Sequence, residues 1–136
     1  MLFRSIAQSN KPGIYARVDD EATILVQYPK AQGIIQASWN WPYSRKDFEV
    51  YGEKGYAIAT GGEGLRVRLP GQRAEETRKP GELPAAESDS ITYLTGMARG
   101  KFKPSGLNGL ENNVIVVEIL QAARESVRTG KKVSLQ

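Results

Sequence analysis

Residues 36–52, QASWNWPYSRKDFEVYG, contain the side chains with the clearest potential for binding chemistry. The segment holds both tryptophans of the chain, followed by an aromatic and charged loop: Trp39, Trp41, Tyr43, Arg45, Lys46 and Asp47. Cationic groups beside aromatic rings suit sugars, phosphates or carboxylates, because rings stack and cations donate hydrogen bonds. The same residues also suit an ordinary surface loop with an internal ion pair, so both interpretations stay open.

The two tryptophans share one face of a predicted strand over residues 33–41, with Ile35 and Ala37. Core packing explains one large aromatic at the end of a strand. Two in succession are also typical of an interface core, where aromatic residues are enriched. The pattern leaves core and interface equally open.

Two other groups could carry chemistry but favour simpler interpretations. Asp19, Asp20 and Glu21 could bind a cation or act as acid and base, yet they lack the spacing of a calcium loop. We interpret them as a solvated strand entry. GGEG at 61–64 is followed by the alternating LRVRL, so it predicts a hairpin turn and not a phosphate loop.

The chain has no cysteine and no histidine among its 136 residues. This composition excludes disulfides, zinc sites of the Cys/His kind and Ser–His or Cys–His catalysis. No GxGxxG fingerprint of a dinucleotide site occurs either. We therefore expect no metal-binding or cofactor-binding residues of these kinds, and any chemistry would fall to Asp, Glu, Lys, Tyr or a borrowed cofactor.

The net charge of +4 comes from 19 basic and 15 acidic residues that are spread along the chain. This mixture favours a solvated surface over a nucleic-acid site. No apolar run approaches the roughly 20 residues of a membrane span, and the first residues do not resemble a signal peptide. We expect a cytoplasmic protein without a membrane or nucleic-acid partner.

The first half of the chain predicts an antiparallel meander. Residues 20–28 and 33–41 alternate in polarity around a short turn, which predicts a β-hairpin. Further short strands follow, separated by tight turns at 53–55 and 61–64. One face is apolar and the other mixed, as in a sheet that is covered on one side.

The second half predicts two helices. The first begins at the capping residues Ser88 to Ser90, ends at Gly100, and would bury Ile91, Leu94 and Ala98. The second covers about 109–129, with Asn108 as N-cap and Gly130 as stop. Its predicted buried stripe is Val116, Leu120, Ala123 and Val127.

These elements predict an α+β fold, with an open, mainly antiparallel sheet and two helices packed on one face. We expect one domain over 1–136. Its parts would be a sheet over 1–69, a loop over 70–87 with a short edge strand around 73–78, a helical part over 88–130, and a final strand over 131–136.

The order of these segments resembles the C-terminal domain of the glucose–fructose oxidoreductase, inositol dehydrogenase and rhizopine-catabolism family (Gfo/Idh/MocA). DDEATILVQYPKAQGIIQASW is similar to its acidic lead-in and first strands. Val50, Gly52 and Gly55 resemble its glycine turn. Its closing helix is matched by Asn113, Val116, Val117, Leu120, Ala123, Ser126, Gly130 and Val133.

The resemblance implies a dihydrodipicolinate-reductase-like C-terminal domain of an NAD- or NADP-dependent oxidoreductase acting on a sugar, polyol or related hydroxyl compound. The family's Rossmann domain, Glu-Lys-Pro motif and Asp…His pair have no match here, so this chain alone is expected to be inactive. The resemblance also implies a homodimer through the sheet and an N-terminal Rossmann domain as partner.

On this resemblance, the substrate-facing candidates are Asn40, Tyr43, Arg45 and Lys46, and the interface candidates are Trp39 and Trp41. The alternative is a stand-alone dimerisation or scaffold module without catalysis, which the aromatic pair and the mixed sheet face would also suit.

Overall fold

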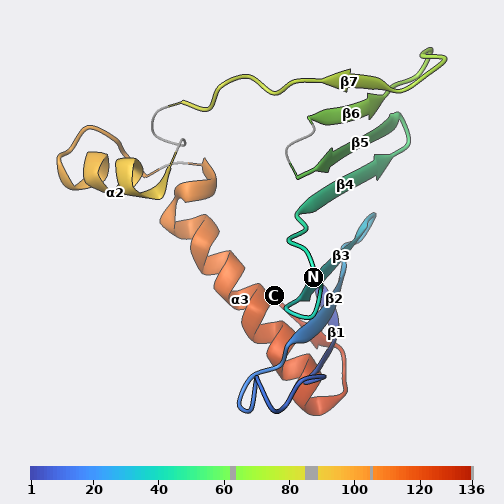
Figure 1. Ribbon diagram of the computed structural model, residues 1–136, viewed down its shortest axis with the longest axis vertical. Coiled ribbons are helices and arrows are strands. Elements are labelled where there is room, and N and C mark those ends of the chain that lie inside the picture. The colour runs from blue at the N-terminus through green and yellow to red at the C-terminus, as the bar shows by residue number, and fades with distance from the viewer. Residues whose placement is uncertain (62–63, 85–88, 105, 136) are drawn as a thin grey trace. The chain divides into compact units, whose positions relative to one another are not determined.

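The computed structural model describes residues 1–61, 64–84, 89–104 and 106–135, and it contains two compact units (Figure 1). The first unit joins Met1–Asn40 to Lys103–Gln136, and the second is Trp41–Phe102. Each holds one four-stranded antiparallel sheet. The first unit contains β1 (Leu2–Gln8), β2 (Glu21–Gln27), β3 (Gln32–Ser38), η1 (Gly106–Asn108), α3 (Leu110–Thr129) and β8 (Val133–Ser134); the second contains β4 (Asp47–Gly52), β5 (Gly55–Thr60), β6 (Leu65–Arg68), β7 (Glu76–Arg78) and α2 (Ser90–Ala98).

The first sheet has the order β3-β2-β1-β8, and α3 packs along one of its faces (Figure 1). Phe3 pairs with Val26 and Ser5 with Ile24, so alternate residues of β1 and β2 point toward the helix. The core consists of Phe3, Ile24, Val26, Ala122 and Ala123, with Ile119, Val133 and Leu135 packed against it. The predicted hairpin is confirmed as β2 and β3.

The buried side of α3 differs from the predicted stripe. Ala123 is buried as predicted, but Val116, Leu120 and Val127 are exposed. The helix instead turns its small residues, Ala122, Ala123 and Ser126, to the sheet. Small side chains allow the helix axis to approach closely, a preference that the hydrophobic period alone does not reveal.

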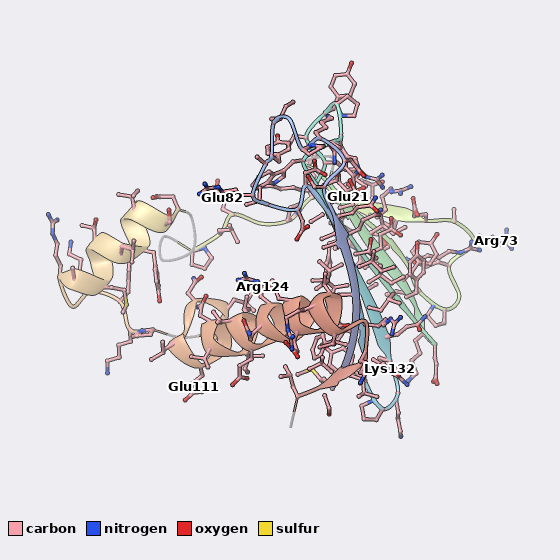
Figure 2. The ribbon with its side chains drawn as sticks, turned by 90° about the horizontal axis from the view of Figure 1, so that it is seen from below. Glu21, Arg73, Glu82, Glu111, Arg124 and Lys132 are labelled. Atoms are coloured by element: carbon pink, nitrogen blue, oxygen red, sulfur yellow. The ribbon has the colours of Figure 1, made fainter. Side chains whose placement is uncertain are left out.

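The predicted boundary of α3 is confirmed at its C-terminal end, but the predicted N-cap is wrong. Gly109, not Asn108, is the N-cap, and no side chain caps the helix there. The predicted stop is confirmed, since Gly130 adopts the left-handed conformation at φ 63°. Figure 2 shows Glu111 in the first turn of α3, Arg124 farther along it, and Lys132 on the link to β8.

A hydrogen bond through Ser126 connects the C-terminal part of α3 to β1. The side chain is fully buried, and its Oγ accepts a hydrogen bond from the backbone N–H of Ser5 at 3.0 Å. The same hydroxyl donates to the carbonyl of Lys131 at 2.8 Å. One small polar group thereby satisfies two backbone groups in the interior.

The second sheet has the order β4-β5-β6-β7 and confirms the predicted meander. Its register places Phe48, Val50, Ala57 and Val67 on one face. The short edge strand predicted around 73–78 is present as β7. Of the predicted turn at 61–64, residues 62 and 63 lie outside the described residues.

Helix α2 does not bury its predicted stripe, because Ile91, Leu94 and Ala98 are exposed. Its buried residue is Gly96, where an added Cβ would lie 2.2 Å from the ring of Phe102. Asp89 caps the helix by accepting hydrogen bonds from two backbone N–H groups, as predicted for this segment. The other predicted cap, Ser88, lies outside the described residues.

The α+β class is confirmed, but its layers differ from those predicted. The strands over 1–69 form two sheets instead of one, because β3 ends at Ser38 and the chain is irregular until β4 begins at Asp47. In the described part of the chain, α3 is the helix that packs along a sheet. Within these residues, no helix combines the length and apolar character needed to cross a bilayer.

Candidate functional site

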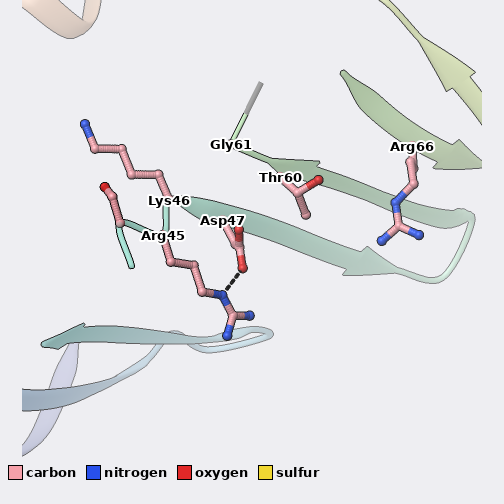
Figure 3. A pocket seen from close by; sticks show the side chains of 7 residues that line it. Arg45, Lys46, Asp47, Thr60, Gly61 and Arg66 are labelled. Atoms are coloured by element: carbon pink, nitrogen blue, oxygen red, sulfur yellow. Dashed lines mark hydrogen bonds and ion pairs between the residues drawn. The ribbon is translucent and has the colours of Figure 1, made fainter. Parts of the chain in front are cut away.

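A hollow in the second unit collects the charged residues of the predicted loop. Its volume is about 420 Å³. The lining residues come from the approach to β4, the end of β5 and the neighbouring strand β6 (Figure 3): Ser44, Arg45, Lys46, Asp47, Thr60, Gly61 and Arg66. Hydroxyl, carboxylate and cationic groups converge there, which suits a polar ligand.

Internal ion pairs hold two of the three cations that line the hollow. Arg45 donates from Nε to Asp47, and this hydrogen bond raises the pKa of the guanidinium. Arg66 lies 3.3 Å from the carboxylate of Glu75. Figure 3 shows that Lys46 extends to the opposite side from Arg45. The hollow therefore offers hydrogen-bond donors with part of their charge neutralised.

The structure brings together two of the four predicted substrate-facing residues. Arg45 and Lys46 line the hollow, whereas Tyr43 is 85% exposed and is not among its lining residues. Asn40 belongs to the first unit. Sequence reasoning missed Thr60, although the tight turn between β4 and β5 places it opposite Asp47 in the hairpin.

A second group of polar residues lies in the first unit, around Asp20. The residue is only 2% exposed. Its carboxylate accepts hydrogen bonds from the backbone N–H groups of Asn10 and Lys11, each at 2.8 Å, and from Nδ2 of Asn40 at 2.8 Å. Burial acts to raise the pKa of this carboxyl, but the hydrogen bonds outweigh it and hold the pKa below its ordinary value of 3.8.

The interpretation of Asp20 as part of a solvated strand entry is therefore wrong. Its neighbour Asp19 is exposed, as that interpretation requires, but Asp20 turns inward. Three consecutive acidic residues look alike in sequence. The preceding loop decides which of them is buried, because Asn10 and Lys11 donate hydrogen bonds to the carboxylate of Asp20.

Glu21, Ser38 and Asn40 extend this polar group along the hairpin. Glu21 and Ser38 face each other in the register of β2 and β3, and Ser38 donates its hydroxyl hydrogen to Glu21. The backbone N–H of Asn40 donates to Oγ of Ser38 at 3.0 Å. This network fixes the backbone on both sides of Trp39.

The tryptophans lie beyond the end of β3, so the strand predicted over 33–41 is too long by three residues. The indole ring of Trp39 contacts the ring of Tyr15, with centroids 5.2 Å apart and planes tilted by 58°. Trp39 is nevertheless 64% exposed. Trp41 is half-buried and belongs to the second unit. The interface role predicted for both residues stays a prediction.

Neither group forms a metal centre. Among the described residues, no three acidic side chains gather closely enough to hold a metal ion. The chemistry available is hydrogen bonding to a polar ligand in the hollow and aromatic contact at Trp39.

Comparison with known proteins adds a family match. Residues 3–58 match the family model described as the GFO/IDH/MocA C-terminal domain. No curated protein matches the chain.

Solved structures share the fold at low sequence identity. Three similar structures, each described as a "putative oxidoreductase", come from Thermotoga maritima (TM-score 0.77, 13% identity), Bacillus subtilis (0.69, 16%) and Klebsiella pneumoniae (0.67, 16%). Each alignment covers 99% of this chain but only 40%, 45% and 43% of the other chain, respectively. The chain thus spans less than half the length of these structures. Residues 3–58 are thus similar to the GFO/IDH/MocA C-terminal domain, and the chain shares its fold with solved structures described as oxidoreductases.

Proposed function

We propose that residues 1–136 act as the substrate-binding and oligomerisation domain of an NAD- or NADP-dependent oxidoreductase. Its substrate would be a sugar, a polyol or a related hydroxyl compound. The observation that carries this proposal is the fold, which matches solved structures described as oxidoreductases over 99% of the chain. A cytoplasmic location belongs to the same proposal.

The nicotinamide cofactor would be held by a Rossmann domain outside the described residues. A dinucleotide site needs a parallel strand, a glycine-rich turn and a helix N-terminus. Every strand pairing found in the described residues is antiparallel, and neither α2 nor α3 directly follows a strand, so these residues do not fit the cofactor. The chain alone is therefore proposed to be inactive.

The hollow at Arg45 is the proposed region of substrate contact. Arg45, Thr60 and Arg66 present hydrogen-bond donors around a volume suited to a small ligand. Because Arg45 and Arg66 are partly neutralised by Asp47 and Glu75, a neutral hydroxyl compound fits better than a strong anion.

Two measurements test this proposal on the purified chain. Absorbance at the nicotinamide band, with NAD⁺ or NADP⁺ and a panel of sugars and polyols, should stay constant. In a ¹⁵N NMR titration with the same compounds, the amide signals of Ser44 to Asp47, Thr60 and Gly61 should shift. Turnover by the chain alone would contradict the proposed inactivity, and a titration without shifts would contradict substrate binding.

Arg45→Ala provides the site-specific test. The variant should lose the shifts at the hollow, because it removes a donor and frees Asp47. Arg73→Ala is the matched control, since Arg73 lies in the loop between β6 and β7 and is not among the residues that line the hollow. Equal shifts in Arg45→Ala and in the unmodified chain would show that the ligand does not bind at Arg45.

The open face of the first sheet is the proposed dimer surface. Opposite the side covered by α3, it presents Ile6, Leu25 and Ile34, which are 66%, 46% and 67% exposed. Glutamines and Arg4 surround these aliphatic side chains. An apolar centre with a polar rim is typical of an interface between subunits. A dimer that binds none of the compounds would favour the stand-alone scaffold module instead.

A further inference from the structure

We propose that Trp39 and Tyr15 form a stacking site for the ring of a neutral sugar or cyclic polyol. The site rests on the function proposed above but lies in the first unit, apart from the residues that line the hollow. It accounts for an aromatic pair that the core of the first unit does not use.

The indole of Trp39 is accessible to solvent although it contacts another ring. Trp39 has one neighbouring ring, Tyr15, at 5.2 Å, yet it remains 64% exposed. A side chain of this size normally buries most of its surface in a folded domain. An indole held by a second ring and otherwise accessible offers a flat, electron-rich surface to a ligand.

Asp20 holds the backbone segments that carry both rings. Its backbone carbonyl accepts the N–H of Trp39 at 2.9 Å, and its carboxylate accepts the N–H of Lys11 at 2.8 Å. The carbonyl of Lys11 in turn accepts the N–H of Tyr15 at 2.9 Å. One buried residue therefore fixes both segments that carry the rings. A surface that is ordered before binding loses less entropy when the ligand arrives.

Polar side chains flank Trp39 in the chain. Glu21, Ser38 and Asn40 lie at the same end of the hairpin as Trp39 (Glu21 is labelled in Figure 2). Carboxylate, hydroxyl and amide groups next to an aromatic surface are complementary to a ring with C–H bonds on its face and hydroxyls at its edge. This polar group flanks the indole in the chain and holds the segment that carries it.

The chain contains only two tryptophans, so fluorescence can report on each separately. In Trp41→Phe, the remaining emitter is Trp39. Titration with myo-inositol and with glucose should change its emission in a saturable way. In Trp39→Phe, the remaining Trp41 should not respond. A Trp39 emission that is unchanged, or that changes linearly without saturation, would overturn the proposal.

Tyr15→Ala tests the pair without touching the emitter. Combined with Trp41→Phe, it should weaken binding about tenfold, the effect of losing one wall of an aromatic contact. Tyr28→Ala is the matched control, because Tyr28 is an exposed tyrosine of the same unit, in the turn between β2 and β3. Equal weakening by both substitutions would overturn the assignment.

NMR titration of the unmodified chain separates this site from the hollow and needs no variant to fold. Shifts at Tyr15, Trp39 and Asn40 support the stacking site. Shifts confined to Ser44–Asp47, Thr60 and Gly61 would overturn it while leaving the proposed function intact. Shifts at neither group would overturn both.

Discussion

Among single residues, Asp20 connects several segments of the first unit by hydrogen bonds. No motif in the sequence predicted this role. Its carboxylate and carbonyl accept hydrogen bonds from the loop before β2 and from the segment after β3. A buried acceptor with this many donors is difficult to replace, because each donor left without a partner costs free energy. Its role is structural, and through Trp39 and Tyr15 it also positions the proposed stacking site.

Asp20→Asn should lower the urea midpoint of unfolding at neutral pH, because an amide cannot accept from the N–H groups of both Asn10 and Lys11. The folded pKa of Asp20 lies below its ordinary value of 3.8, so its stabilisation is present above that pH and is lost as pH falls through the folded pKa. The difference between the two proteins should therefore shrink progressively below about pH 3.8. Asp19→Asn, at the exposed neighbour, is the control and should change little.

Ser126→Ala tests the polar contact between α3 and β1. The substitution leaves the N–H of Ser5 and the carbonyl of Lys131 without their buried partner. We expect the free energy of unfolding to fall by about 1–3 kcal/mol, measured by urea denaturation. Ser134→Ala, at an exposed position of β8, should change it by less than about 0.5 kcal/mol. Similar effects of both substitutions would show that the bridge contributes nothing specific.

Among the secondary-structure elements, the turn between β4 and β5 contains two glycines. The conformation of the turn requires glycine at only one of these two positions. Gly55 has φ 126°, and a Cβ there would lie 2.0 Å from the carbonyl oxygen of Arg68 on β6. Gly52 has ordinary φ, and a Cβ there would meet nothing closer than 3.8 Å. The two positions are three residues apart in the same hairpin, which makes them a matched pair.

Gly55→Ala should lower the free energy of unfolding by about 2–4 kcal/mol, because both backbone strain and a clash with a backbone oxygen oppose the side chain. Gly52→Ala should change it by less than about 1 kcal/mol. Thermal or urea unfolding monitored by circular dichroism would measure both values. A tolerated alanine at 55 would mean that the β5–β6 pairing adjusts at little cost.

At the scale of the whole molecule, the proposed dimer rests on the uncovered face of the first sheet. Ile34→Asp places a charge beside Leu25 among the apolar residues of that face and should convert a dimer into a monomer. Light scattering on a size-exclusion column, at several concentrations, would measure the molar mass. Ile91→Asp is the control, because Ile91 is also exposed but lies on α2. An unmodified chain that is monomeric at every concentration would remove the proposed interface.

Local patterns in the sequence were sufficient to predict much of the fold. Alternation in residues 20–38 predicted the hairpin, and glycine at Gly130 predicted the helix stop, because both depend on interactions between near neighbours in the chain. The first strand, β1, was not predicted as an element, although Phe3 and Ser5 alternate with exposed residues. The predicted loop contributed Arg45 and Lys46 to the hollow, but Thr60 and Arg66 came from strands whose register had to be known.

The amino-acid sequence was enough to predict the α+β class, the order of most elements and the resemblance to the GFO/IDH/MocA C-terminal domain. These features follow from periodicity, turn chemistry and the order of short motifs, which are all local. Tertiary structure alone decided which side of α3 is buried, that Asp20 turns inward while Asp19 does not, and that Trp39 meets Tyr15. Those outcomes depend on contacts between segments distant in the chain, where several arrangements satisfy the same local pattern and close packing selects one.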